Sequence, residues 1–309
     1  MLLITGSIAY DYIMDFPGKF ADHILPDQLH NINLSFMVNT FAKRRGGTAG
    51  NVSYTLGLLT TPQILFSVAG MDFGEYKEAF AKLGIDTRHI SINKKIYTAT
   101  GFAMTDKSNN QIWGFFNGAI ADSTKLQLKS VAKKNDFVLI GPQGEGTISM
   151  VKQAVTLGVP YLYDPGFTLT NVSDTDLTYG VTHAHSLIGN DYELKLINDR
   201  VKDFASLTKE KMVITTLGKD GAKIIVNGKK TVIKPAKPIA VVDPSGAGDA
   251  WRGGFLAGWQ RGYDLKTCGQ MGSIASCYAI EHYGPQEHSY TKQQFAKRYK
   301  DTYNETLLI

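Results

Sequence analysis

The chain has 309 residues, of which 43% are hydrophobic and 20% charged, with a formal net charge of +5 at pH 7. This length suits one α/β domain with a small appendage. The mild, scattered charge argues against a nucleic-acid partner, no apolar run is long enough to cross a bilayer, and Cys268 and Cys277 are too few for a disulfide framework, so we expect a reduced, cytoplasmic protein with no membrane partner.

The first 120 residues combine strand-like, aromatic-rich segments with one helix-like segment. The opening "MLLITGSIAYD" indicates a first strand and not a signal peptide, because it lacks a charged n-region and a cleavage site. Strands are expected within 10–20, 31–47, 97–106 and 109–120, and a helix within 48–59. We expect strands from about 10–45 and 95–118 to pair into a small sheet beside a larger one, where it would act as a lid.

Residues 136–235 alternate between short apolar strands and helix-like connections. Strands are expected within 136–141, 159–166 and 184–191, helices within 147–158 and 192–199, and a strand, a turn and a hairpin within 211–235. This rhythm predicts a mostly parallel central sheet with helices on both faces. Functional residues in such sheets gather at the carboxyl ends of the strands.

A glycine-rich turn follows at residues 239–258, "IAVVDPSGAGDAWRGGFLAG". A strand, a loop and a helix opening at Asp249 would aim backbone N–H groups and a helix dipole at one anion site. No Lys-Ser/Thr pair follows the glycines, so the loop is not a Walker A motif, and G-x-G-x-x-G is not met. Asp249 alone fits either a helix N-cap or a general base that takes a proton from an alcohol while the N–H groups hold a phosphate.

Four motifs in this order resemble the signatures of the ribokinase-like (PfkB) carbohydrate kinase family. They are "RRGGTAGNVSYTLGLL" (44–59), "NDYE" (190–193), "TTLGKDGA" (215–222) and "DPSGAGDAWRGGF" (243–255). Within the family, the spacing looks closest to the bacterial adenosine kinases. The resemblance implies a single ribokinase-like domain over residues 1–309 with a small β-sheet lid, acting on a small molecule as a monomer or homodimer.

The resemblance also implies roles for the residues around the acceptor. Asp249 would be the catalytic base. The anion hole for the transferring phosphoryl group would be formed by Gly246, Ala247 and Gly248. The ribose hydroxyls would be held by Asp11, Gly47 and Asn51, and the base would stack on Phe102 and Phe115.

On the nucleotide side, the resemblance implies ATP, Mg²⁺ and a potassium ion. ATP would lie along Thr216, Gly218 and Gly221. Asn190 and Glu193 would organise Mg²⁺ and the phosphates, with Glu193 acting through water. Asp243 and Ser245 lie where relatives bind K⁺.

Departures from the family pattern affect some of these roles. Pro244-Ser245 and Trp251 replace more usual residues, and Gly166-Phe167 stand where adenosine kinases carry polar residues near the purine. The potassium site and the base specificity depend most on these positions. Arg252, one helical turn after Asp249, fits either a phosphate contact or a surface salt bridge.

Together these residues predict ATP-dependent phosphorylation of the 5′-hydroxyl of adenosine to AMP, a purine-salvage reaction. The alternatives are a PfkB-type kinase for ribose or fructose, a kinase for another nucleoside, a catalytically silent nucleotide-binding protein, and a dehydrogenase. Aromatic residues in the lid favour a nucleoside, because a small sugar needs no flat surface. The retained "GAGD" with Asp249 argues against a silent protein.

Overall fold

The structure is a computed structural model that describes residues 1–24, 33–108 and 110–309. Within them, the centre is an eight-stranded sheet in the order β14-β13-β12-β11-β10-β9-β1-β4. Its strands are β1 (Leu2–Thr5), β4 (Gln63–Leu65), β9 (Phe137–Ile140), β10 (Tyr161–Tyr163), β11 (Ser186–Asn190), β12 (Met212–Thr216), β13 (Ala222–Val226) and β14 (Lys229–Ile233). Every pair from β4 to β12 is parallel, and β13 and β14 extend the edge as an antiparallel hairpin. The predicted mostly parallel sheet is confirmed.

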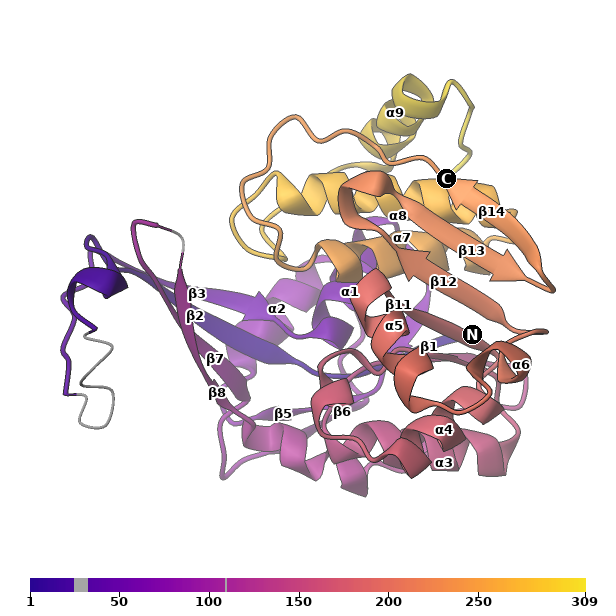
Figure 1. Cartoon of the computed structure of the whole chain (residues 1–309), viewed down its shortest axis with the longest axis horizontal. Coiled ribbons are helices and arrows are strands. Elements are labelled where there is room, and N and C mark those ends of the chain that lie inside the picture. The colour runs from indigo at the N-terminus through magenta and orange to yellow at the C-terminus, as the bar shows by residue number, and fades with distance from the viewer. Residues whose placement is uncertain (25–32, 109) are drawn as a thin grey trace.

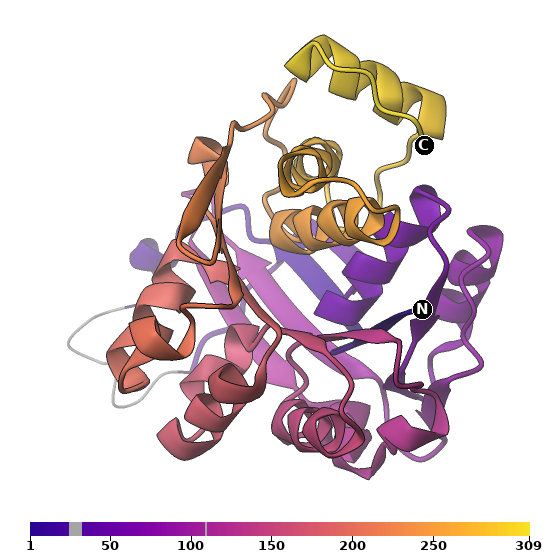
Figure 2. The same cartoon turned by 90° about the vertical axis from the view of Figure 1, so that its right-hand side faces the viewer.

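Helices cover both faces of this sheet, as Figure 2 shows with one helical layer above it and one below. The helices are α1 (Thr48–Leu58), α2 (Gly74–Lys82), α3 (Glu145–Leu157), α4 (Asp174–His183), α5 (Asp191–Arg200), α6 (Phe204–Leu207), α7 (Ala247–Gln260), α8 (Leu265–Ile280) and α9 (Lys292–Tyr303). One core lies under α1, α7 and α8, and the other under α3, α4 and α5. Short 3₁₀ helices complete the connections: η1 (Phe20–Asp22), η3 (Gly118–Lys125), η4 (Leu128–Ser130), η5 (Gly166–Thr170) and η6 (Gly218–Asp220).

The central strands are largely apolar because both of their faces are buried. In β1, Leu2 and Ile4 belong to the core under α7 and α8, whereas Leu3 belongs to the core under α3 and α4. Successive side chains of a strand point to opposite faces, so a strand between two helical layers needs apolar residues throughout. This explains why the sequence shows continuous apolar runs here and not an alternation.

A small sheet projects from the main body on the left of Figure 1, in the order β3-β2-β7-β8. Its strands are β2 (Ala9–Asp15), β3 (Thr40–Gly46), β7 (Ala99–Thr105) and β8 (Gln111–Phe116). The predicted pairing of two distant segments into a second sheet is therefore confirmed, whereas its action as a lid stays a prediction. The strand expected from residue 31 begins only at Thr40, and residues 25–32 and 109 of the predicted segments lie outside the described residues. A further parallel pair joins β5 (Ser67–Gly70) to β6 (Ile90–Asn93).

Two expectations for the glycine-rich turn are corrected by the structure. Residues 239–243 form no strand but part of a loop that follows β14, and α7 begins at Ala247 and not at Asp249. Gly246 is the N-cap of α7 with φ of 73°, a left-handed conformation that glycine adopts without strain. Asp249 therefore lies inside the first turn of the helix.

The remaining sequence-based exclusions concern membranes and disulfides. Among residues 1–24, 33–108 and 110–309, no helix is both long enough and apolar enough to span a bilayer. Cys268 and Cys277 are buried, free thiols on the same helix, α8.

Helices α7 and α8 pack so closely that glycine is required between them. A Cβ atom at Gly254 would lie 2.6 Å from the carbonyl oxygen of Met271 and 2.9 Å from Cα of Gly272. These neighbours are backbone atoms, so relief requires the two helices to move apart. Because Asp249 lies in the first turn of the same helix, this contact also fixes where the helix N-terminus lies.

We therefore expect Gly254→Ala to lower the free energy of unfolding by about 1–3 kcal/mol, the usual cost of overpacking a core. Urea denaturation monitored by circular dichroism measures the change. Gly74→Ala is the matched control, since a Cβ at this first residue of α2 would meet no atom within 4 Å. Equal stability of the two variants would show that α7 and α8 do not need this close approach.

Candidate functional site

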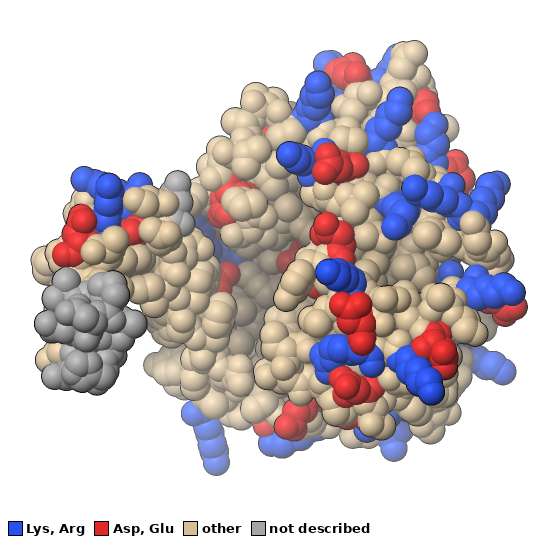
Figure 3. Space-filling view, viewed as in Figure 1, with Lys and Arg blue, Asp and Glu red and all other residues tan. Residues whose placement is uncertain are grey.

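Two cavities meet at the N-terminus of α7. The larger, about 1560 Å³, lies between the small sheet and the main body, and the smaller, about 590 Å³, follows the carboxyl ends of β10, β11 and β12. Figure 3 shows the hollow between the two parts of the molecule, with charges of both signs interspersed on the surrounding surface. Asp249, Thr48 and Phe167 line both cavities.

The larger cavity contains most of the residues predicted to hold the acceptor. Asp11, Gly47, Asn51 and Phe115 all line it. Asp11 lies on β2 directly opposite Gly101 of β7, and a Cβ at Gly101 would lie only 2.6 Å from its Oδ1 atom. Burial, with a smaller contribution from Asp243, raises the pKa of Asp11 to about 6. A carboxylate in this setting accepts hydrogen bonds from hydroxyl groups.

The two predicted stacking residues lie on opposite faces of the small sheet. Phe115 is paired with Gly101, faces the cavity with 74% of its surface exposed, and stacks on Trp113 with ring centroids 5.3 Å apart. Phe102 is paired with Tyr12 and stacks on it at 5.4 Å, outside the residues that line the cavity. Successive residues of a strand point to opposite faces, so this arrangement contradicts base stacking on Phe102.

Asp249 is bound to Asn51 and does not cap its helix. It is the third residue of α7, whose N-cap Gly246 has no side chain, and its Oδ2 atom accepts a hydrogen bond of 2.8 Å from Nδ2 of Asn51. Burial raises the pKa of Asp249 to about 6, while Arg252 and the Asn51 hydrogen bond act in the opposite direction. The N-cap alternative is therefore wrong, and burial holds the pKa of this carboxyl group well above its ordinary value.

The backbone around the glycine-rich turn offers donors to an anion. The amide of Ala247 already donates to the carbonyl of Pro244 at 3.2 Å, which removes it from the predicted anion hole. Gly248 and Asp249 follow in the first helical turn, where N–H groups have no carbonyl partner within the helix. Ala247 and Gly248 line the smaller cavity, whereas Gly246 does not.

Arg252 forms a buried ion pair with Asp164 at the end of β10. Its Nε lies 2.5 Å from Oδ2 and its Nη2 2.9 Å from Oδ1 of Asp164, and both side chains are less than 10% exposed. The surface salt bridge considered from the sequence is thus an interior one. Its Nη1 lies 2.9 Å from where a Cβ of Gly248 would be, so the guanidinium borders the anion site.

The smaller cavity contains the residues predicted to hold a nucleotide. Asn190 and Glu193 form a capping box at the start of α5, in which Oδ1 of Asn190 accepts from the Glu193 amide at 2.7 Å and Oε2 of Glu193 accepts from the Asn190 amide at 2.8 Å. Thr216 ends β12, and Gly218 and Gly221 follow with φ of 55° and 89° in the tight connection to β13. All five residues line this cavity.

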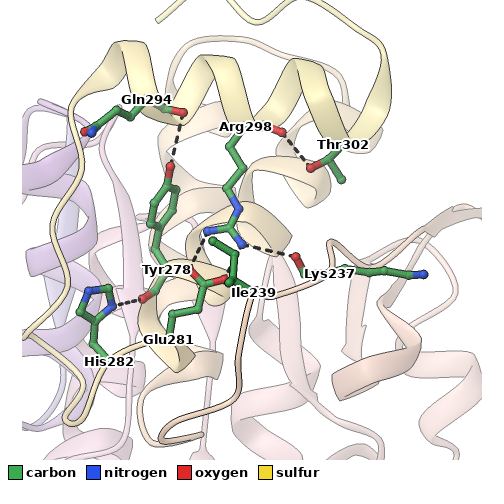
Figure 4. A network of polar contacts seen from close by, with 8 residues as sticks. All are labelled: Lys237, Ile239, Tyr278, Glu281, His282, Gln294, Arg298 and Thr302. Atoms are coloured by element: carbon green, nitrogen blue, oxygen red, sulfur yellow. Dashed lines mark hydrogen bonds and ion pairs between the residues drawn. The ribbon is translucent and has the colours of Figure 1, made fainter.

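The far wall of the smaller cavity is a loop, held in place by α8 and α9 (Figure 4). Pro235, Ala236, Pro238 and Val241 of this loop line the cavity. Glu281, just after α8, accepts a hydrogen bond of 2.6 Å from the Ile239 amide, and Arg298 of α9 donates to both of its carboxylate oxygens, at 2.8 and 2.5 Å. Figure 4 shows the Arg298 guanidinium between Glu281 and the carbonyl of Lys237.

The predicted potassium ligands lie beside the glycine-rich turn but outside the lining of both cavities. Oδ1 of Asp243 accepts from the Ser245 amide at 2.8 Å, and Oδ2 accepts from the Gly284 amide at 3.0 Å. Asp243 thus ties the turn to the segment after α8. In the part of the chain that the structure describes, no three His, Cys, Asp or Glu side chains form a ready-made metal cluster.

Three further residues at the site were not predicted from the sequence. Trp113 supports Phe115, Asp164 holds Arg252, and Gln286 donates to Asn51 at 2.8 Å. The "DPG" turn after the β10 strand was a usable signal for Asp164, because strand ends in parallel sheets carry functional residues. No signal in the sequence marks Gln286, which is 235 residues from its partner.

Comparison with known proteins gives a consistent result. The model of the pfkB family carbohydrate kinases matches residues 10–292. A nucleoside kinase of Methanothermobacter thermautotrophicus is 31% identical, with 96% of this chain and 95% of that protein covered. An ATP-dependent 6-phosphofructokinase of Thermoanaerobacterium thermosaccharolyticum is 42% identical over 81% of this chain and 83% of its own length.

The structure of Burkholderia thailandensis nucleoside kinase in complex with inosine superposes with a TM-score of 0.87, at 33% identity and 99% coverage of each chain. The family and the ribokinase-like fold are confirmed, whereas the narrower resemblance to adenosine kinases is not confirmed by these relatives.

Proposed function

The chain belongs to the pfkB family of carbohydrate kinases, and we propose that within it the protein is an ATP-dependent nucleoside kinase that phosphorylates the 5′-hydroxyl of adenosine. The observation that carries this proposal is the position of Asp249 where two cavities meet. One cavity has hydroxyl-binding groups and an exposed aromatic ring, and the other has a glycine-rich nucleotide turn. A carboxylate between an alcohol and a phosphate suits proton abstraction during phosphoryl transfer.

In the proposed reaction, the 5′-oxygen of the nucleoside forms a bond to the γ-phosphorus of ATP while the bond to the β,γ-bridging oxygen breaks. The hydroxyl proton passes to Asp249, and ADP leaves. The first-turn amides of α7 and the Arg252 guanidinium would stabilise the charge on the transferring group. Asp164 would hold that guanidinium in place, so that no reorientation is needed during the reaction.

Magnesium fits the smaller cavity through water. Glu193 uses Oε2 in its capping box, and its carboxylate borders the same cavity as the proposed phosphate site. Mg²⁺ prefers oxygen ligands and retains several waters, so one carboxylate with phosphate oxygens is a sufficient donor set. When bound, the ion would neutralise phosphate charge. Potassium at Asp243 and Ser245 stays a prediction.

A nucleoside acceptor is favoured over a free sugar by the stacked pair of Phe115 and Trp113. These rings offer a flat apolar surface beside Asp11, and a purine fills such a surface whereas ribose or fructose does not. Two relatives named as nucleoside kinases support this choice. The phosphofructokinase relative supports the alternative of a sugar kinase. The second alternative is a kinase for a nucleoside other than adenosine.

The first expected result is ATP-dependent product formation with a nucleoside. Purified protein with ATP and Mg²⁺ should convert adenosine to AMP, and its kcat/KM for adenosine or another purine nucleoside should exceed that for ribose, fructose and fructose 6-phosphate. Product analysis by chromatography over this panel of acceptors measures the ranking. A higher kcat/KM for any of the sugars would replace the nucleoside proposal with the sugar-kinase alternative.

The second expected result concerns the base. Asp249→Asn should lower kcat by about 10²–10⁴ with ATP and nucleoside binding retained, because the amide keeps the shape but accepts no proton. In the wild type, kcat should fall as the pH drops through about 6, since protonation of Asp249 removes the base. Steady-state kinetics between pH 5 and 8 measure both effects.

Asp11 provides the internal control for this pH profile, because its pKa also lies near 6. A group that only binds the acceptor acts on KM, so its titration should appear in kcat/KM and not in kcat at saturation. An Asp249→Asn variant with near wild-type kcat would remove the base assignment.

The third expected result separates the two faces of the small sheet. Phe115→Ala should raise the KM for adenosine roughly 5- to 150-fold, the equivalent of ~1–3 kcal/mol of base stacking, and leave the KM for ATP unchanged. Phe102→Ala is the matched control, since its ring lies on the opposite face, and the adenosine KM should not change. An unchanged KM in a folded Phe115→Ala variant would contradict base stacking at this position.

A further inference from the structure

A buried chain of hydrogen bonds leads away from Asp249 and ends at the small sheet. Asn51 donates to Asp249 at 2.8 Å, Gln286 donates through Nε2 to Oδ1 of Asn51 at 2.8 Å and to the Tyr76 hydroxyl at 2.5 Å, and Tyr76 donates to the carbonyl of Gly46 at 2.8 Å. The three linking side chains are at most 6% exposed. The chain joins elements far apart in sequence: α7, α1, the segment after α8, α2 and β3.

The two ends of this chain determine the direction of every bond in it. An ionised carboxylate and a backbone carbonyl only accept hydrogen bonds, so Asn51 must present its NH₂ group to Asp249 and Tyr76 its O–H to Gly46. The Asn51 oxygen and the Tyr76 oxygen are then both acceptors, and the group between them must donate twice. The NH₂ group of Gln286 is the one that does so.

Packing leaves little freedom for another arrangement. A Cβ at Gly50 would lie 1.9 Å from the Tyr76 hydroxyl and 3.3 Å from Nε2 of Gln286, so the glycine makes room for the chain. Gln286 is 1% exposed, and its Oε1 atom has no partner among the described residues. An amide buried in this way is held by its two donated bonds.

We propose that Gln286 is a positioning residue, which fixes the side-chain amide of Asn51 so that its NH₂ group, and not its oxygen, faces Asp249. This inference rests on the proposed role of Asp249 as the base. If Asn51 turned over, its carbonyl oxygen would face the carboxylate, and a favourable contact would become a repulsive one. Gln286 touches neither acceptor nor nucleotide in this scheme and acts only through Asn51.

The orientation of Asn51 matters because the charged groups around Asp249 have opposing effects on its ionisation. Arg252 on α7 favours the ionised form, whereas Asp164 after β10 and Glu193 on α5 disfavour it, together with burial. The Asn51 bond is the uncharged contribution that favours ionisation. Loss of this donor should therefore raise the pKa of Asp249. The fall of kcat at low pH, which is the acid limb of its pH profile, should then begin at a higher pH.

The same chain of hydrogen bonds also determines which atoms Asn51 can offer to the acceptor. Its oxygen is occupied by Gln286, so toward the cavity it offers N–H and not C=O. Asp11, across the cavity, offers only acceptor atoms when ionised. A hydroxyl that donates to Asp11 and accepts from Asn51 satisfies both groups, so Gln286 also determines which polarity the acceptor pocket presents.

The test uses two nearly isosteric variants, Gln286→Glu and Gln286→Met. The glutamate supplies acceptors where two donors are needed, so Asn51 turns its NH₂ group toward residue 286, and the methionine removes the donors while keeping the volume. We expect the acid limb of kcat to shift upward by about one pH unit in Gln286→Glu, by less in Gln286→Met, and kcat at pH 6 to fall in both. Profiles are recorded at saturating ATP and adenosine.

Gln270→Glu is the matched control. Gln270 is a buried glutamine on α8 whose Oε1 accepts from Tyr299 at 2.5 Å, away from both cavities. A buried glutamate should lower the melting temperature of both Gln270→Glu and Gln286→Glu. Only Gln286→Glu should shift the acid limb of the kcat profile to higher pH. An acid limb that coincides with that of the wild type in both folded Gln286 variants would overturn the positioning role.

The outcome separates this inference from the proposed function. If the wild type shows no acid limb near pH 6, or if Asp249→Asn retains kcat, the base assignment fails and the inference fails with it. If the limb is present and depends on Asp249 but does not move in the Gln286 variants, only the inference fails.

Discussion

The site depends on the parallel order of the central strands. Strands β1, β9, β10, β11 and β12 all run in one direction, so the segments after them, with Ser7, Asp164 and Asn190, emerge at one edge of the sheet. Parallel strands require crossover connections, and the helices in those connections bury both faces. What remains at the carboxyl edge is a row of loops, and the N-terminus of α7 points its free amides into it. The hydrophobic cores thus hold the polar groups of the site at fixed distances.

This placement imposes an electrostatic conflict that the structure resolves locally. Asp164, Glu193 and Asp249 border one cavity, and burial disfavours the ionised form of any carboxylate. The charge of Asp164 is offset by a bidentate contact with Arg252, and the Glu193 carboxylate accepts a hydrogen bond from the Asn190 amide in the capping box of α5. Asp249 has a neutral partner, Asn51, in addition to the nearby guanidinium, and its pKa stays near 6. A carboxyl group without a direct ion pair is better able to exchange a proton near neutral pH than one bound to arginine.

Local patterns were sufficient to predict the fold and the segments that meet around the smaller cavity. Each of three motifs can be recognised from a few adjacent residues: the glycines of "PSGAGD", those of "TTLGKDG", and the "NDYE" helix start. The structure brings all of these segments to one place. The other features depend on which strands pair and in which register, and the sequence does not show this. Phe102 and Phe115 looked equivalent because both follow strand-like patterns, but only the β7–β8 register, in which Gly101 faces Phe115 and Phe102 faces Gly114, separates them by face. Residues 239–243 resembled a strand by composition, yet no sheet edge among the described residues pairs with them.

The longest-range contacts were the least accessible to sequence reasoning and connect the two halves of the site. Asp11 belongs to the small sheet and Asp249 to the main body, and in the proposed reaction the acceptor would contact both at once. The two are joined covalently at Gly46 and Gly47, where Gly47 has a φ of 86° and a Cβ would lie 2.6 Å from the Ala9 amide. They are joined again by the bonds from Gly46 through Tyr76, Gln286 and Asn51 to Asp249. A displacement of β3 relative to α7 would have to break one of these buried bonds, and a buried polar group left without a partner costs roughly 1–3 kcal/mol. The end of the small sheet nearest the base is therefore the end that is held most firmly, and any movement of the sheet must increase with distance from Gly46.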